Sequence, residues 1–170
     1  MKREQKIVAI GAASGVLTML LLVSAIAYFL PDIRILDSFQ ERIRFALIAN
    51  VFAIIPLFVM LAAEGNARLL SKAINPLRHS ENKITEIDGR VADNTLQQNF
   101  VFLIVSLTAS TLMWHEYLNI IWGCGIVFAL ARIAFWVGYR IDPLYRAAGM
   151  AATACMNFFL ILYILYSLIW

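Results

Sequence analysis

Three polar side chains recur at helical spacing near residue 90, at the start of an apolar stretch. Arg90, Asn94 and Gln97 stand at positions i, i+4 and i+7, so they share one face of a helix. A guanidinium and two amides on one face can bind an anion. The alternative is a solvated first helical turn whose arginine reaches the headgroups, because the stretch 88–93 contains two aspartates and a glycine that are acceptable at a helix start.

A second polar set lies inside the next apolar stretch. Arg132, Phe135 and Tyr139 have the spacing i, i+3 and i+7, and Arg140 and Arg146 follow them. Arg132 lies about two turns, or roughly 12 Å, from Arg140, which is too deep for an arginine that merely ends a membrane helix. Charged residues at such a depth usually face a bundle interior or a wet cavity and mark functional sites.

Arg132 also has a structural alternative, an ion pair inside the bundle. Glu64 and Asp93 are the nearest plausible carboxylates, and the scarcity of such groups favours a ligand pocket. Several guanidiniums with an amide and a phenol suit a small ligand with several negative charges, because a guanidinium binds a carboxylate through two parallel hydrogen bonds. An anionic peptide or a lipid headgroup has this chemistry.

The composition predicts an all-α integral membrane protein. Of the 170 residues, 62% are hydrophobic and 15% are charged, which is too apolar for a soluble domain of this length. A spanning helix needs about 20 apolar residues, and no long segment alternates as the strands of a membrane barrel do. Five spans are expected, at residues 7–30, 45–63, 96–114, 118–139 and 147–170.

Lysine and arginine predict the orientation, because cytoplasmic loops carry more of them. The N-terminus is expected inside and the C-terminus outside. The net charge of +3 follows from this asymmetry, so nucleic-acid binding is not indicated, whereas attraction to anionic lipid headgroups is. The inner cations are Lys2, Arg3, Lys6, Arg68, Lys72, Arg78, Lys83, Arg90, Arg140 and Arg146, and the outer charges are Asp32, Arg34, Asp37, Glu41, Arg42 and Arg44.

The first span also fits a cleaved signal peptide, because residues 1–6 are basic and small residues occur at 24–27. Its apolar run is longer than the usual h-region of about 7 to 15 residues, and Gly11 with Gly15 forms a small-residue face suited to close helix packing. A retained helix is therefore favoured. Residues 1–44 are expected to form an N-terminal transmembrane helix with an outer loop, and residues 45–170 a four-helix membrane domain.

No metal site or disulfide is expected. The two cysteines, Cys124 and Cys155, both fall within expected spans, and the two histidines are far apart in the sequence, so neither a zinc-ligand cluster nor a disulfide framework is indicated. The sequence also contains no Ser/His/Asp set at informative spacing and no Gly-rich phosphate loop. The chemistry of the chain therefore rests on its buried and clustered arginines.

Two segments resemble motifs of the membrane-associated proteins in eicosanoid and glutathione metabolism, the MAPEG family. Residues 90–97, Arg-Val-Ala-Asp-Asn-Thr-Leu-Gln, resemble the family's Arg-x-x-x-Asn-x-x-Glu motif, and residues 131–139 followed by Arg146 resemble a second signature. Arg68 resembles the basic residue that ends the family's first helix. The resemblance covers about residues 45–170 and implies four helices that assemble as a homotrimer and bind glutathione between subunits near the cytoplasmic face.

The same resemblance implies a glutathione transferase or peroxidase that acts on lipophilic electrophiles. Arg146 would be the catalytic residue, because an adjacent guanidinium favours the nucleophilic thiolate. Two departures put catalysis in question: Gln97 replaces a glutamate, and Phe135 stands where active members commonly carry tyrosine or histidine. The glutathione pocket would be lined by Arg68, Arg90, Asn94, Gln97, Arg132, Tyr139 and Arg146.

Two other functions remain open. The additional first helix and the segment 37–44 resemble mattrin, a divergent five-span branch, which implies a noncatalytic regulator of membrane-protein trafficking that binds glutathione or lipid together with a membrane-protein partner. In a eukaryote it would lie in the endoplasmic reticulum, Golgi or lysosome. A small channel or transporter is the third option, because Asn50, Pro56 and Asn157 lie in mid-span, although such residues are more often packing devices.

Overall fold

The computed structural model describes residues 2–30, 38–71, 75 and 80–170, and these residues form helices without any strand. The all-α prediction is therefore confirmed. Several charges used for the orientation, Asp32, Arg34, Asp37, Lys72 and Arg78, lie outside the described residues, so the orientation stays a prediction. The helices are α1 (Arg3–Phe29), α2 (Phe39–Leu69), α3 (Lys83–Leu112), the short 3-10 helix η3 (His115–Tyr117), α4 (Asn119–Ile141) and α5 (Ala147–Ile169).

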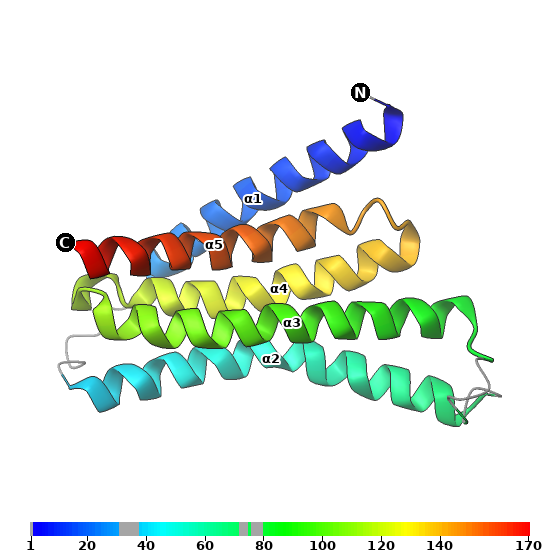
Figure 1. The fold of residues 1–170 in the computed structure, drawn as a ribbon, viewed down its shortest axis with the longest axis horizontal. Coiled ribbons are helices and arrows are strands. Elements are labelled where there is room, and N and C mark those ends of the chain that lie inside the picture. Colours follow the sequence, from blue (N-terminus) through cyan, green and yellow to red (C-terminus); the bar gives the residue numbers. More distant parts are fainter. Residues whose placement is uncertain (1, 31–37, 72–74, 76–79) are drawn as a thin grey trace.

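Helices α2 to α5 form a bundle in which α2 and α5 each pack beside both α3 and α4. Helix α1 packs on the outside against α4 and α5, and its first turns lean away from them (Figure 1). The chain runs up and down, so the ends of α2 and α4 lie near the beginnings of α3 and α5. We call this the basic end of the bundle, because Arg68, Arg90, Arg140 and Arg146 lie there.

Side-chain caps fix where α2 and α3 begin. The Ser38 side chain accepts a hydrogen bond from the backbone N–H of Glu41, and the Glu41 carboxylate accepts one from the backbone N–H of Ser38, which forms a capping box. Asn82 accepts a hydrogen bond from the Thr85 N–H at 2.8 Å. The alternative that placed a helix start within 88–93 is therefore wrong, because the Asn82 cap lets α3 begin at Lys83.

Among the described residues, four segments are long and apolar enough to cross a membrane: α1, α2, the stretch His115–Ile141 and α5. Helix α3 does not reach this hydropathy, because its middle carries the run of Gln97, Gln98 and Asn99. Within the bundle, Gln98 accepts a hydrogen bond from Asn157 at 3.1 Å, and Asn99 donates to the Thr95 carbonyl at 3.1 Å. Internal hydrogen bonds thus offset part of the free-energy cost of placing these amides in a membrane bundle. That α3 crosses the membrane as the fifth span stays a prediction.

The mid-span amides of the channel hypothesis also have partners between helices. Asn50 on α2 donates to Ser106 Oγ on α3 at 2.8 Å, and Asn157 joins α5 to α3. Pro56 is buried inside α2. Polar bonds of this kind hold membrane helices together, so these residues act in packing.

Small residues let the helix backbones approach closely. A Cβ added to Gly125 on α4 would lie 2.5 Å from the carbonyl oxygen of Ala49 on α2, and one added to Gly15 on α1 would collide with the backbone of Ala148 on α5. The face formed by Gly11 and Gly15 therefore packs as expected, with Gly11 close to Ala147. Such contacts replace the hydrophobic driving force that lipid does not supply between membrane helices.

Gly125→Ala should destabilise the bundle. The new methyl group meets backbone atoms of α2, so the helices must move apart, at a cost of about 1 to 3 kcal/mol, and the Tm measured in detergent should fall. Gly65→Ala on α2 is the matched control, because nothing lies within 4 Å of that methyl position, and alanine in a helix should leave the Tm equal or raise stability by about 0.5 to 1 kcal/mol. Equal Tm values for both variants would contradict the close approach.

Candidate functional site

The Arg132 guanidinium joins three helices in the basic half of the bundle. The residue is fully buried, with 0% of its surface exposed. Its Nη1 donates to Thr153 Oγ1 on α5 at 3.0 Å, and its Nη2 donates to Asn94 Oδ1 on α3 at 2.8 Å. The guanidinium carbon lies 4.1 Å from the centre of the Phe135 ring, within the range of a cation–π interaction.

The positive charge of Arg132 has no carboxylate partner among the described residues, and its Nε–H has no hydrogen-bond acceptor. Neither of the two expected partners reaches it, because Glu64 binds Arg68 and Asp93 is exposed. The structural ion pair is therefore not formed. A buried donor without an acceptor costs about 1 to 3 kcal/mol, so this group is suited to an anionic ligand.

Tyr139 connects this buried group to Arg146. The Tyr139 ring packs edge-on against Phe135 with their centres 5.9 Å apart. Arg146, the residue before α5, donates from Nη1 to the Tyr139 hydroxyl at 3.0 Å, and its guanidinium carbon lies 5.0 Å from the ring centre. Arg146 is exposed whereas Tyr139 is buried. The aromatic pair thus spans the distance between one buried and one accessible guanidinium.

The remaining expected site residues do not join this group within one chain. Arg90 is exposed and its Nη2 lies 2.7 Å from the Glu86 carboxylate, and Gln97 is exposed on the same helix. Of the predicted face of α3, only Asn94 reaches Arg132. The structure therefore brings together Asn94, Arg132, Tyr139 and Arg146, and directs Arg90 and Gln97 outward.

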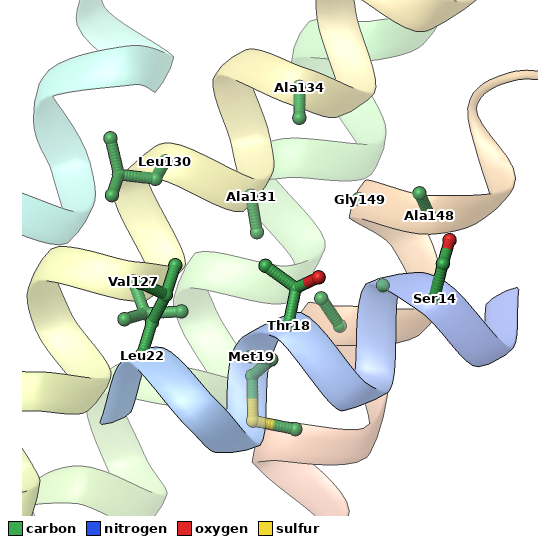
Figure 2. Close-up of a pocket in the computed structure, with 12 residues that line it drawn as sticks. Ser14, Thr18, Met19, Leu22, Val127, Leu130, Ala131, Ala134, Ala148 and Gly149 are labelled. Carbon is green, nitrogen blue, oxygen red and sulfur yellow. The ribbon is translucent and has the colours of Figure 1, made fainter. Parts of the chain in front are cut away.

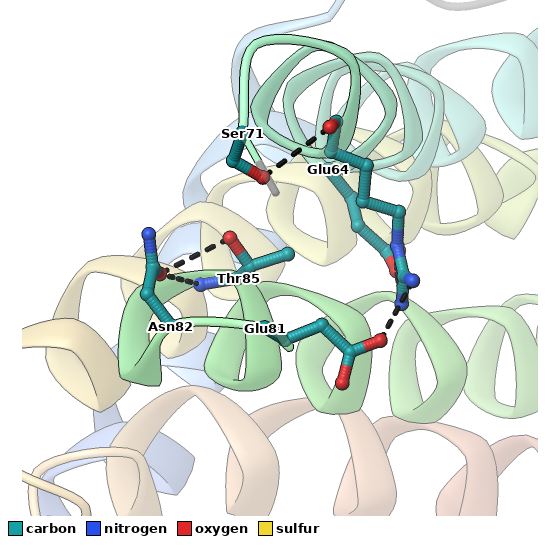
Figure 3. Close-up of polar contacts among 6 residues, drawn as sticks. Glu64, Ser71, Glu81, Asn82 and Thr85 are labelled. Atoms are coloured by element: carbon teal, nitrogen blue, oxygen red, sulfur yellow. Dashed lines mark hydrogen bonds and ion pairs between the residues drawn. The ribbon is translucent and has the colours of Figure 1, made fainter. Parts of the chain in front are cut away.

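Arg68 is held between two carboxylates at the end of α2. Its guanidinium lies 2.9 Å from Glu64 Oε1 on the same helix and 2.7 Å from Glu81 Oε1 just before α3. Figure 3 shows Glu64 and Glu81 on opposite sides of this junction, next to Asn82 and Thr85 at the start of α3. Arg68 thus ties the two helices together, and both carboxylates already neutralise its charge.

Asp88 is the structural residue that sequence reasoning missed. Its carboxylate is 1% exposed, and it accepts hydrogen bonds from Trp136 Nε1 at 2.7 Å, from Arg140 Nε at 2.8 Å and from Arg140 Nη2. The Arg140 guanidinium also lies over the Trp136 ring at 4.7 Å. The sequence contained a signal for this position, because Asp88 precedes the apolar Val91 and Ala92 by three and four residues, a spacing that puts it on the apolar face of a helix.

Asp88→Asn should destabilise the basic end of the bundle. Asparagine keeps the shape but removes the charge that binds Arg140, and hydrogen bonds to charged groups contribute about 1.5 to 3 kcal/mol. The Tm in detergent should fall by several degrees for a bundle of this size. Asp93→Asn removes a charge from the exposed face of the same helix and should leave the Tm unchanged. A stable Asp88→Asn protein would show that Asp88 does not anchor α4.

The sequence model of the MAPEG family matches residues 46–166, which is well over half of the chain. The match begins within α2, so α1 lies outside it, and it includes Asn94, Arg132, Tyr139 and Arg146. No curated protein and no solved structure matches the chain. Within the described ranges, no group of three His, Cys, Asp or Glu side chains could hold a metal ion.

Proposed function

The chain belongs to the MAPEG family, and we propose from this that it binds glutathione at the basic end of the bundle. The observation that carries the proposal is Arg132, a fully buried guanidinium whose Nε has no acceptor and which has no carboxylate partner among the described residues. Glutathione is an anionic tripeptide with two carboxylates, and a carboxylate is the group that a guanidinium binds best. The donors supplied by Arg132, Asn94 and Arg146 fit such a ligand.

The proposed site is completed by a second subunit in a homotrimer. Arg90 and Gln97 face outward from α3, whereas Arg132 and Tyr139 lie inside the bundle. A pocket between subunits would let the outward residues of one copy and the accessible Arg146 of another contact the same ligand. Arg68 has a smaller role in this proposal than the sequence predicted, because Glu64 and Glu81 already bind it.

Arg146 is the proposed thiolate-stabilising residue. Its bond to the Tyr139 hydroxyl holds the guanidinium in place, and its exposed side chain is accessible to a ligand. A free thiol has a pKa near 8.5, which a nearby guanidinium lowers. The thiolate sulfur would then bond to the electrophilic carbon of a lipophilic substrate from the bilayer, and the leaving group would depart with its electron pair. With the N-terminus inside, this site faces the cytoplasm.

Glutathione should raise the Tm of the purified protein in detergent. A ligand at 100 times its Kd stabilises by about 2.7 kcal/mol. Arg132→Gln should abolish this shift because it removes the buried charge, whereas Arg44→Gln, an exposed arginine near the other end of α2, should keep it. Gln97→Glu should strengthen binding about tenfold, because a charged hydrogen bond to the ligand amine replaces a neutral one.

The Gln97→Glu variant keeps this test informative even where Arg132→Gln fails to fold, because residue 97 is exposed. A tighter Kd in this variant supports a glutathione site that includes α3. No Tm shift for the wild-type protein across the millimolar range would overturn the proposed glutathione site.

Arg146→Ala should lower kcat/KM for conjugation of glutathione to a generic aromatic electrophile. Each unit by which the thiol pKa rises reduces the thiolate fraction about tenfold at neutral pH, so the loss should shrink as the assay pH is raised. Arg44→Ala should leave the rate unchanged. A wild-type rate no higher than the uncatalysed background would exclude the transferase activity.

A noncatalytic regulator is the second candidate, and Phe135 favours it. This residue is buried beneath Arg132 and offers only a ring face, where active family members commonly present a polar group. A mattrin-like role in membrane-protein trafficking would then use the ligand site for sensing and α1 for a partner. Glutathione binding without turnover, together with loss of a stoichiometric membrane-protein partner on deleting residues 1–30, would support this function over catalysis.

A further inference from the structure

Helices α1, α4 and α5 line an apolar pocket. The pocket has a volume of about 220 Å³. Figure 2 shows Thr18 on α1, Leu130, Ala131 and Ala134 on α4, and Ala148 on α5 around it. The α1 wall of the pocket lies outside the family match, whereas the walls from α4 and α5 lie within it.

The lining determines what the pocket can hold. It contains no charged side chain, and its hydroxyls are those of Ser14 and Thr18. The Ser14 hydroxyl already donates to the Gly11 carbonyl at 2.9 Å. A buried water needs two to four polar partners, which this lining does not provide. An empty space would forfeit the dispersion contacts of its walls, so an apolar occupant is favoured.

The surroundings supply such an occupant. All three lining helices are long and apolar enough to cross a membrane, and Leu130, Ala134 and Thr18 are exposed at the rim. The pocket therefore opens toward the bilayer. A helix from another protein, with a diameter of about 10 to 12 Å, is too wide for this volume, whereas a single hydrocarbon chain is narrow enough.

The charge on α1 indicates which lipid is preferred. Arg3 lies about three turns before Ser14 and on the same face of α1, roughly 16 Å away along the helix. Arg3, Lys2 and Lys6 are all exposed in the first turns. Basic residues at the end of a membrane helix attract anionic headgroups. The separation of Arg3 from Ser14 suits a headgroup at Arg3 whose own acyl chain reaches the pocket.

We propose that this pocket binds one acyl chain of an anionic glycerophospholipid, with the phosphate at the level of Arg3. The acyl chain fills the space lined by Thr18, Ala131 and Ala134, beside the place where Gly15 packs directly on the Ala148 backbone. The lipid thereby completes the contact of α1 with α4 and α5. This site is separate from the proposed glutathione site, because none of the side chains that bind Arg132 lines it.

Photolabelling of the full-length protein in nanodiscs tests the proposal. Phosphatidylglycerol with a diazirine in one acyl chain should give adducts on residues 14–22, 127–134 and 148–152, located by mass spectrometry of the digested protein. Phosphatidylcholine with the same chain should label these segments less strongly. Equal labelling by both lipids would overturn the assignment to an anionic lipid, and adducts spread evenly over all five helices would overturn the pocket itself.

Variants that fill the pocket provide the second part of the test. Ala134→Phe should reduce pocket adducts about tenfold or more, since losing the burial of two methylene groups already gives that factor. Ala62→Phe, on the exposed face of α2, should not. Ser14→Leu fills the pocket from α1 instead, and its exposed neighbour Ala13→Leu, which does not line the pocket, is the matched control. This pair keeps the test decisive where Ala134→Phe fails to fold. Unchanged labelling in both pocket variants would overturn the proposal.

Discussion

The buried charge of Arg132 is the constraint on which the basic half of the bundle depends. A charged side chain at the centre of a membrane helix costs about 3 kcal/mol or more, so it must be surrounded by protein rather than by lipid. Asn94, Thr153 and Phe135 supply two acceptors and a ring face from three helices. Since each of these contacts needs its helix at a fixed distance, satisfying this one charge also fixes how α3, α4 and α5 are placed.

Close backbone packing makes these hydrogen bonds possible. Gly149 on α5 sits against the backbone of Ala131 and Phe135 on α4, where an added Cβ would collide, and these residues flank Arg132. The absence of a side chain brings α5 near enough for Thr153, one turn after Gly149, to reach the guanidinium at 3.0 Å. Small residues and the buried charge thus act together, because neither the packing nor the polar contact forms at a larger helix separation.

The sequence predicted the helices well where the side chains are apolar, and less well where polar side chains are buried against other helices. Helices α4 and α5 lie close to their predicted ranges, since both are strongly apolar. Hydropathy did not reveal the start of α3, which the Asn82 cap sets. It also did not reveal the role of Asp88, a polar residue that is buried against Trp136 and Arg140. Helical spacing was also too coarse to predict which polar side chains of α3 reach Arg132. An arc of about 60° includes both Asn94, which turns inward, and Gln97, which turns outward.

The two faces of α4 explain how the chain can carry an additional helix without disturbing its candidate site. One face presents Arg132 and Tyr139 to the helices that bind them, and the other presents Ala134 and Leu130 to the space beside α1. Polar contacts hold the first face, while the second has only small and apolar groups. Helix α1 therefore covers a surface that lipid would otherwise cover, and its addition changes the boundary with the bilayer rather than the hydrogen bonds of the buried arginine. The two faces meet where Gly149 packs against Ala131. Helix α1 also contacts Ala147 and Ala148, which directly follow Arg146, so an influence of α1 on the site can act through either contact.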